Sequence, residues 1–531
     1  MTWSGDANIR RRALCVRPKA AAPVAGFLSS IADEWLEALA LHCDLTIVEQ
    51  DFDYRALCDA VQPDFVLFEG LMPARPVPLD IANIDAHPSI PRAAFLAGDP
   101  HDCIRPLIFK MFDDFRVETI FAYGYEYLQQ MPELGVGIFS VGIFVDSAVY
   151  RDYGLTKTIP ISIFGGLLAP DFYVWRAEMG RQLPLRFPTL IYTHPGYGTV
   201  PSHTYAVMGE DYARLINQSH YSLADTTRLH CIVRKHLEIP AAGAVLVAPD
   251  TPPLGDYGFV DMENCILGTG RELYAKIGAT GRDRDLYESI RRAGHDLVHG
   301  RHTRQHWRYI LDWYECRRSL RPGEIVQQVG QFGPFRAAPG DRFQTGMVDL
   351  TMPDNEMTAI LRNARSAILG DGSLEAAERQ LREVTTWVDH VTEPWLLLAL
   401  IALLRSAPAE ASAHLGRSYE IQQGRQGFVS SDPVELAWRQ VIARLQGDAT
   451  LLDSLWQQAE GIEHLSLRRV RFLLTALDGV RGRRPAGLDR RLPGDRLSIH
   501  WIGQEDWPNW VNLVGRVLSA NGLAAPSFLQ S

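Results

Sequence analysis

The chain lacks paired cysteines and has very few lysines. Its seven cysteines stand singly, no two are separated by only two residues, and their number is odd. This pattern argues against a disulfide framework and against a cysteine-ligated zinc site, and it favours a reducing compartment. Of the 53 basic residues nearly all are arginine, which points to a GC-rich bacterial genome and says nothing about mechanism.

Long apolar runs are also missing. The strongest one, Trp395 to Leu404, covers about half of the roughly twenty residues that a membrane span requires. Arg10 to Arg12 precede an apolar run that ends too soon for a secretory signal. A formal net charge of -10 gives no support to a nucleic-acid partner. We therefore expect a cytoplasmic protein without a transmembrane segment.

Several cofactor and nucleophile motifs are absent. The stretch Gly268-Thr269-Gly270 lacks the third glycine of a dinucleotide fingerprint, and residues 16–26 contain no Gly-x-Gly. Neither a Gly-x-Ser-x-Gly elbow nor a Walker lysine loop occurs. These absences argue against a nicotinamide dehydrogenase, a serine hydrolase of the elbow type and a P-loop NTPase.

Short apolar strands alternate with amphipathic helices over the first 155 residues, and the pattern restarts after Asp152. Fully apolar strands that alternate with helices predict parallel sheets covered on both faces. We predict an α/β fold with two tandem Rossmann-like domains and an all-α C-terminal domain. The predicted bounds are 1–155, 156–318, a connector at 319–352, and a helical domain at 353–531.

Helical periodicity dominates the C-terminal domain and suggests a small bundle or a TPR-like array. The helices predicted there cover 353–370, 373–390, 394–406, 432–446, 449–461, 466–478 and 507–522.

Two loops of the second domain have the character of an anion site. The strand at 160–164 ends in Gly165-Gly166, where a bare backbone can approach a phosphate, and Arg176 follows in the next helix. The second loop, at 225–228, leads into a helix predicted at 229–241, whose first turns present N–H groups to a diphosphate. Its candidate ligands are Thr226, Arg228, Arg234 and Lys235. The alternative for Gly165-Gly166 is an ordinary tight turn beside a surface arginine.

The run from Arg234 to Val247, with Glu238 and Gly243 inside it, resembles a block of glycosyltransferases with the GT-B fold. The closest resemblance is to the spore-maturation-protein-like (CgeB-type) glycosyltransferases. It extends through Glu210 to Ser219, Phe144 to Tyr150, and the loop Leu96 to Asp102, so it covers roughly residues 60–315 and is specific around 210–247.

The resemblance implies a metal-independent transferase with no cofactor, which takes a nucleotide sugar as donor. A glutamate at the position of Glu238 then hydrogen-bonds the ribose; the alternative is an ion pair with Arg234, one turn earlier. Related retaining families carry another glutamate where this chain has His230, and this departure leaves the stereochemistry open. Arg228, Arg234 and Lys235 are the candidates for stabilising the departing diphosphate.

Acceptor activation by an inverting enzyme needs a base, for which Asp99, His101 and His230 are the candidates. The alternative for Asp99 is a helix cap. Four histidines, at 295, 299, 302 and 306, share one helix face, which we interpret as packed or solvated rather than as a metal site.

The acceptor is unknown, and the helical domain is a candidate for binding a macromolecular acceptor or for self-association. Two rival functions stay open. The first is a non-catalytic GT-B-derived scaffold that acts through its helices, and the second is a nucleotide-sugar epimerase.

Overall fold

The computed structural model describes most of the chain in two compact units. The described residues are 10–19, 26–70, 77, 79–97, 100–102, 104–124, 137–166, 172–193, 207–340, 347–348, 355–387, 390–426, 432–480, 485–492, 494–524 and 526. The first unit contains Met1–Leu96, Glu118–Glu126 and Val136–Asn355, and the second is built mainly from Ala97–Val117 and Glu356–Ser531. Within the described ranges, no helix combines the length and the apolar character that crossing a membrane requires.

The first sheet is parallel and has the strand order β2-β1-β4-β6-β7-β8. Its strands are β1 (Arg11–Val16), β2 (Cys43–Val48), β4 (Phe65–Gly70), β6 (Arg92–Leu96), β7 (Thr119–Tyr123) and β8 (Ile138–Val141). The helices α1 (Gly26–Ala40) and α2 (Tyr54–Val61) connect its first strands, and β3 (Phe52–Asp53) pairs with β5 (Ile81–Ala82) beside it. The chain order reverses between β1 and β4, which is where ligands bind in open α/β sheets.

The second sheet is also parallel, in the order β10-β9-β11-β12-β13. Its strands are β9 (Ile159–Phe164), β10 (Thr189–Tyr192), β11 (Ser219–Leu223), β12 (Val245–Ala248) and β13 (Ile266–Leu267). The helices around it are α5 (Val174–Gln182), α6 (Gly209–Asn217), α7 (Lys235–Ala241), α8 (Pro252–Asp256) and α9 (Gly270–Arg282). Apolar side chains from both faces of this sheet form two buried clusters. The prediction of two Rossmann-like sheets is therefore confirmed.

One predicted helix begins later than expected. The segment predicted as a helix over 229–241 is helical only from Lys235, in α7. Thr227 and His230 adopt positive φ angles of 61° and 56°, which a right-handed helix does not allow. Arg228 therefore lies on a loop and not at a helix N-terminus.

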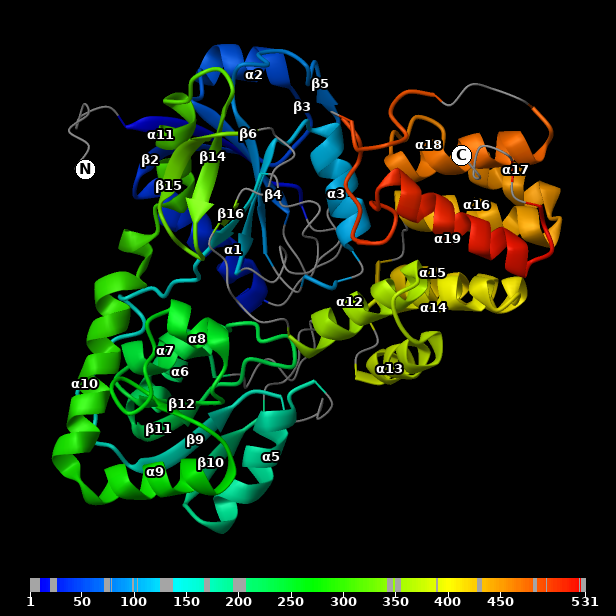
Figure 1. Cartoon of the computed structure of the whole chain (residues 1–531). Helices are drawn as coiled ribbons and strands as arrows, with labels where there is room; N and C mark the ends of the chain where they lie inside the picture. Colours follow the sequence, from blue (N-terminus) through cyan, green and yellow to red (C-terminus); the bar gives the residue numbers. More distant parts are fainter. Residues whose placement is uncertain are drawn as a thin grey trace. The chain divides into compact units, whose positions relative to one another are not determined.

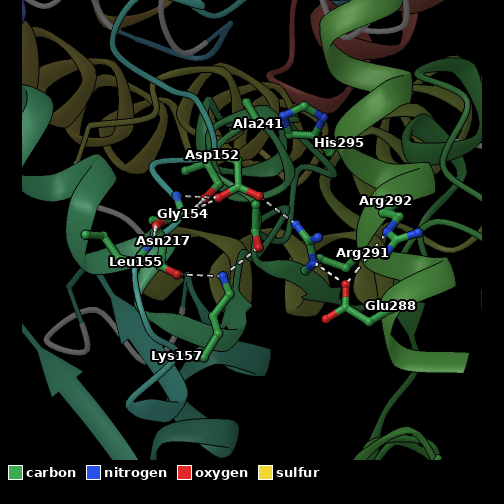
Figure 2. A network of polar contacts seen from close by, with 12 residues as sticks. Asp152, Gly154, Leu155, Lys157, Asn217, Ala241, Glu288, Arg291, Arg292 and His295 are labelled. Atoms are coloured by element: carbon green, nitrogen blue, oxygen red, sulfur yellow. Dashed lines mark hydrogen bonds and ion pairs between the residues drawn. The ribbon is translucent and has the colours of Figure 1, made fainter. Parts of the chain in front are cut away.

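A polar network fastens the link between the two sheets to the second sheet (Figure 2). The side chain of Asp152 accepts hydrogen bonds from Gly154 N and Asn217 Nδ2, both at 2.9 Å, and it pairs with Arg291 at 2.9 Å. Lys157 donates to the carbonyl oxygens of Asn217 at 2.5 Å and Gly243 at 2.6 Å. The network therefore ties the linker at 152–157 to α6, to the turn between α7 and β12, and to the helix α10 (Arg284–Arg301).

After the second sheet the chain continues through α10 (Arg284–Arg301) and α11 (Tyr309–Arg318). The segment predicted as a connector contains the three-stranded sheet of β14 (Glu324–Val329), β15 (Phe335–Pro339) and β16 (Met347–Val348). In this sheet β14 pairs antiparallel with β15 and parallel with β16. The residue pattern of the segment, rich in Gly, Pro and Gln, hid these strands.

The second unit is helical. It consists of α3 (Arg105–Asp114), α12 (Glu356–Leu369), α13 (Leu374–Trp387), α14 (Glu393–Leu404), α15 (Pro408–Gln426), α16 (Pro433–Gln446), α17 (Ala449–Gln458), α18 (Leu465–Leu477) and α19 (Trp507–Ala520). Figure 1 shows its C-terminal helices in yellow to red, with α14 beside α15 and α16 beside α18. The predicted helical region is confirmed, but the sequence did not predict α15, whose polar residues hide its apolar positions. The structure also assigns α3, which connects β6 to β7, to this unit.

Candidate functional site

A glycine turn follows β9 and brings two cations together. Gly165 has a φ of +133°, and a Cβ added there would lie 2.6 Å from Arg176 Nη1 and 3.6 Å from Lys235 Nζ. Only glycine fits such a position, because the backbone angle and the close approach both disfavour a side chain. We call the group Gly165, Gly166, Arg176 and Lys235 the cationic cradle.

Arg176 is held in the cradle by three contacts. The side chain is buried, and its guanidinium carbon lies 4.1 Å from the centre of the Tyr173 ring, within the range of a cation–π contact. Nη1 donates to the carbonyl oxygen of Gly166 at 3.4 Å, and the backbone N donates to Asp225 Oδ2 at 3.1 Å. Burial raises the pKa of Asp225 and the charge of Arg176 opposes this rise. The sequence analysis did not select Asp225, although an acidic residue directly after a buried strand is a signal for a site.

Lys235 opens α7 and points its ammonium at the same turn. Burial, together with the positive charge of Arg176, lowers the pKa of Lys235 to about 8 against the opposing effect of Glu238. Among the described carboxylates, none forms an ion pair with Lys235 or with Arg176. Two adjacent cations without a paired carboxylate, beside bare glycine backbone, favour an anionic ligand.

Glu238 lies one turn further along α7 and is 6% exposed. Its carboxylate is 3.3 Å from Arg234 Nε and accepts a hydrogen bond from Tyr150. The hydroxyl of Tyr212 is buried and has no hydrogen-bond partner within the described part of the chain. Burial, followed by the charge of Glu238, raises the pKa of both tyrosines. The carboxylate therefore lies in a polar site with one phenolic donor still unused.

Arg234 lies at the start of α7 and forms ion pairs with two carboxylates. Besides Glu238 it contacts Glu34 of α1, with Nη2 2.6 Å from Oε2, so it links the two α/β domains. Burial raises the pKa of Glu34, and Arg234 opposes this rise. Because two carboxylates already compensate its charge, Arg234 has less of its charge available to a ligand than Arg176 or Lys235.

The loop before α7 is strained. Thr227 and His230 both have a left-handed backbone, which costs energy in residues other than glycine and is concentrated at functional sites. Thr226 is buried, and Arg228 N donates to the carbonyl oxygen of Phe172 at 3.2 Å. Burial lowers the pKa of His230, so the imidazole is neutral at pH 7, and its Nδ1 has no hydrogen-bond partner in the residues described.

The predicted acceptor-side loop is only partly described. Asp99 lies outside the described residues, so its role stays a prediction. His101 belongs to the second unit and is fully buried, with Nδ1 2.9 Å from Glu393 Oε1. The sequence predicted that His101 faces the acceptor as a candidate base. In the structure its ring is buried and bound to Glu393, so it stabilises the loop and does not face an acceptor.

The carboxyl ends of β1 and β4 carry a second polar cluster. Glu69, at the end of β4, accepts a hydrogen bond from Trp35 Nε1 at 3.0 Å and from Arg17 Nε at 2.6 Å. Glu69 is 2% exposed, and burial raises its pKa against the effect of Arg17. The sequence analysis missed Glu69, although a charged residue that ends a fully apolar strand was the available signal.

The histidine stripe is explained by packing. His299 Nε2 lies 3.1 Å from the carbonyl oxygen of Ala241, and His302 Nε2 lies 2.8 Å from that of Tyr257. His295 stacks against His299 with ring centres 4.2 Å apart. In the ranges that the structure describes, no three histidine, cysteine, aspartate or glutamate side chains gather as a metal site would require.

Comparison with known proteins identifies the domain that holds the cradle. Residues 160–311 match a family described as glycosyl transferase-like. This segment contains the cationic cradle, the strained loop and Glu238, so the chain carries a glycosyltransferase domain. No curated protein matches the chain.

Solved structures of similar fold include three bacterial proteins. Sucrose-phosphate synthase from Thermosynechococcus elongatus is 9% identical, with 57% of this chain and 97% of that chain covered and a TM-score of 0.37. A glycosyltransferase from Rickettsia africae is 12% identical, with 58% and 98% covered and a TM-score of 0.38. HepE from Anabaena, solved in complex with UDP, is 11% identical, with 56% and 98% covered and a TM-score of 0.35.

Proposed function

We propose that this protein transfers a sugar from a nucleoside-diphosphate sugar to an acceptor, with the diphosphate bound in the cationic cradle. The observation that carries the proposal is the pair of Arg176 and Lys235, which converge on Gly165 and form no ion pair with a carboxylate of the described residues. A diphosphate matches this pair in charge and can also accept hydrogen bonds from the glycine backbone. The family match over the same residues supports it.

The cradle also supplies what the departing group needs. When the bond to the sugar breaks, negative charge grows on the diphosphate, and preorganised cations in a partly buried site stabilise it. We assign this role to Lys235 and Arg176, which makes a metal ion unnecessary. Glu238 accepts from the ribose hydroxyls, and the neutral imidazole of His230 bonds to the donor sugar or its phosphate.

We place the acceptor at the first sheet, at the carboxyl ends of β1 and β4. The order of strands reverses there, and the pair of Arg17 and Glu69 forms a rigid polar floor. We further propose that the protein is a GT-B enzyme of the spore-maturation-protein-like branch, on the strength of the residues from Arg234 to Val247.

A thermal-shift panel tests the donor site. UDP, GDP, dTDP, ADP and CMP are added, with and without their sugars, to the wild type, to Lys235→Met and to Lys276→Met. Lys276 is the matched control, because it lies on α9 in ion pairs with Asp261 and Glu272. A ligand at 100 times its Kd stabilises a protein by about 2.7 kcal/mol.

We expect one nucleotide class to raise the Tm of the wild type and of Lys276→Met but not of Lys235→Met. The sugar donor of that class should then release its nucleoside diphosphate during turnover. If no nucleotide shifts the Tm, or if Lys235→Met responds like the wild type, the cradle does not bind a diphosphate. The first of these results would favour a scaffold that acts through its helices.

A further inference from the structure

The helix α1 of the first α/β domain presents two glutamates to the second domain. Glu34 and Glu37 lie three residues apart, on one face of the helix. Glu34 pairs with Arg234 at 2.6 Å, and Glu37 pairs with Arg304, which follows α10, at 3.1 Å. These four residues belong to the first compact unit. The two domains therefore contact each other here through two ion pairs.

Each of the two arginines also contacts a second carboxylate. Arg304 Nη1 lies 3.2 Å from Oδ2 of Asp146, in the segment between the two sheets. Arg234 Nε lies 3.3 Å from Oε1 of Glu238, one turn further along α7. Of the two ion pairs, only the one between Glu34 and Arg234 is therefore connected to the carboxylate that we assign to the ribose.

Arg234 binds its two carboxylates unequally. Nη2 donates to Glu34 Oε2 at 2.6 Å, whereas Nε is 3.3 Å from Glu238 and forms no hydrogen bond with the residues that the structure describes. A guanidinium that has a single carboxylate partner can bind it through two parallel N–H groups, which turns both carboxylate oxygens toward the arginine. Because Glu34 binds Nη2, Arg234 does not form this bidentate pair with Glu238.

We propose that Glu34 is a positioning residue of the donor site, which holds Arg234 and so prevents a bidentate pair between Arg234 and Glu238. Such a pair would compete with the ribose hydroxyls for the oxygens of Glu238. The inference rests on the proposed function, in which Glu238 accepts from the ribose. Glu34 acts only through Arg234, so ribose recognition by the second domain depends on a residue of the first.

Calorimetric titrations with UDP, GDP, ADP and inorganic pyrophosphate test the positioning role. Glu34→Gln should raise the Kd of the nucleoside diphosphate that binds the wild type by about five- to tenfold, which corresponds to one hydrogen bond to a charged group. The Kd of pyrophosphate, which has no ribose, should stay within about twofold. Glu34→Asp retains a carboxylate and should therefore bind the nucleoside diphosphate more tightly than Glu34→Gln does.

Glu37→Gln is the matched control. It removes one negative charge and one ion pair from the same face of α1, but its partner Arg304 contacts Asp146 and not Glu238. It should leave the Kd of the nucleoside diphosphate within about twofold of the wild type. All variants are compared by circular dichroism, and Glu34→Asp replaces Glu34→Gln in the comparison if the latter does not fold.

A double-mutant cycle tests whether Glu34 acts through Glu238. In the Glu238→Gln background the carboxylate that Arg234 would bind is already gone, so adding Glu34→Gln should change the Kd of the nucleoside diphosphate by less than about twofold. A loosened contact between the domains would instead weaken binding in both backgrounds.

Four results would overturn the inference. They are an unchanged Kd in Glu34→Gln, a parallel loss for pyrophosphate, an equal loss in Glu37→Gln, and a full further loss in the Glu238→Gln background. The wild-type titration separates these results from a failure of the proposed function. If the wild type binds none of the three nucleotides, the proposed function fails and this inference fails with it.

Discussion

Replacing Lys235 with methionine should stabilise the free protein and weaken nucleotide binding at the same time. Burial lowers the pKa of Lys235 from 10.5 to about 8. Each pKa unit corresponds to about 1.36 kcal/mol, so the charged form costs at most about 3 kcal/mol of folding free energy. The side chain is partly exposed, and screening reduces this to about 1–3 kcal/mol. Methionine fills the same space without that cost.

The pH dependence follows from the direction of the shift. Between pH 8 and pH 10.5 the unfolded chain holds the Lys235 proton while the folded protein has released it, so the stability of the wild type rises with pH in this window. The cost is complete below pH 8 and is gone above the unfolded pKa. The advantage of Lys235→Met should therefore be largest at pH 7 and disappear near pH 10.5.

Nucleotide binding should change in the opposite direction. A hydrogen bond to a charged group contributes about 1.5–3 kcal/mol, so the variant should raise the Kd for the nucleoside diphosphate by about 10- to 150-fold. In the wild type, affinity should fall as pH rises through about 8, because the free lysine loses its proton. Calorimetric titrations at pH 6.5, 7.5 and 9, with unfolding curves at pH 7 and 10.5, measure both effects. A variant that is less stable at pH 7, or that binds as tightly as the wild type, would refute the reasoning.

Three other substitutions test neighbouring features. Burial lowers the pKa of Lys157 to about 8 as well, but Lys157→Met leaves the carbonyls of Asn217 and Gly243 without their donor, at about 1–3 kcal/mol each, which outweighs the relief. The variant should therefore destabilise by about 1–3 kcal/mol in denaturant unfolding, the opposite sign to Lys235→Met, and an unchanged stability would contradict this. Gly165→Ala should weaken nucleotide binding at least about tenfold by calorimetry, since its Cβ would collide with Arg176. Gly166→Ala, with open space around its Cβ, is its control, and equal effects would count against the cradle. Glu238→Gln should raise the Kd of the nucleoside diphosphate about tenfold and leave that of inorganic pyrophosphate unchanged, because the carboxylate is assigned to the ribose; parallel losses would disprove the assignment.

Much of the fold could be predicted from local pattern. Phe65 to Phe68 are fully apolar and form the first four residues of β4, and short apolar runs of this kind also identify β6, β9 and β12. The turn at Gly165-Gly166 could be predicted because two consecutive glycines after an apolar strand allow the backbone angles that a tight turn needs. The helix α15 was missed because its polar residues obscure the apolar stripe on which helix prediction depends.

The start of α7 could not be predicted either. The residues from Leu229 onward have helical periodicity, but Thr227 and His230 are held in left-handed conformations by the surrounding loop. Intrinsic preference is weak compared with such tertiary constraints. The sequence therefore predicted a site on this loop, but it could not predict the backbone geometry that orients the side chains.

The sequence alone determined the two α/β domains, the helical region after them and the group of residues from which a donor site would be built. Only the tertiary structure decided which of these groups are paired. His101 meets Glu393 at a separation of 292 residues, and Arg234 meets Glu34 of a different domain. Arg176 and Lys235 lie together, and neither forms an ion pair with a carboxylate in the part of the chain that the structure describes. Strand and helix patterns depend on residues that are close together in the chain, and so they can be predicted from the sequence alone. The charge available to a ligand depends on the partners that folding brings from distant segments, and no local pattern contains that information.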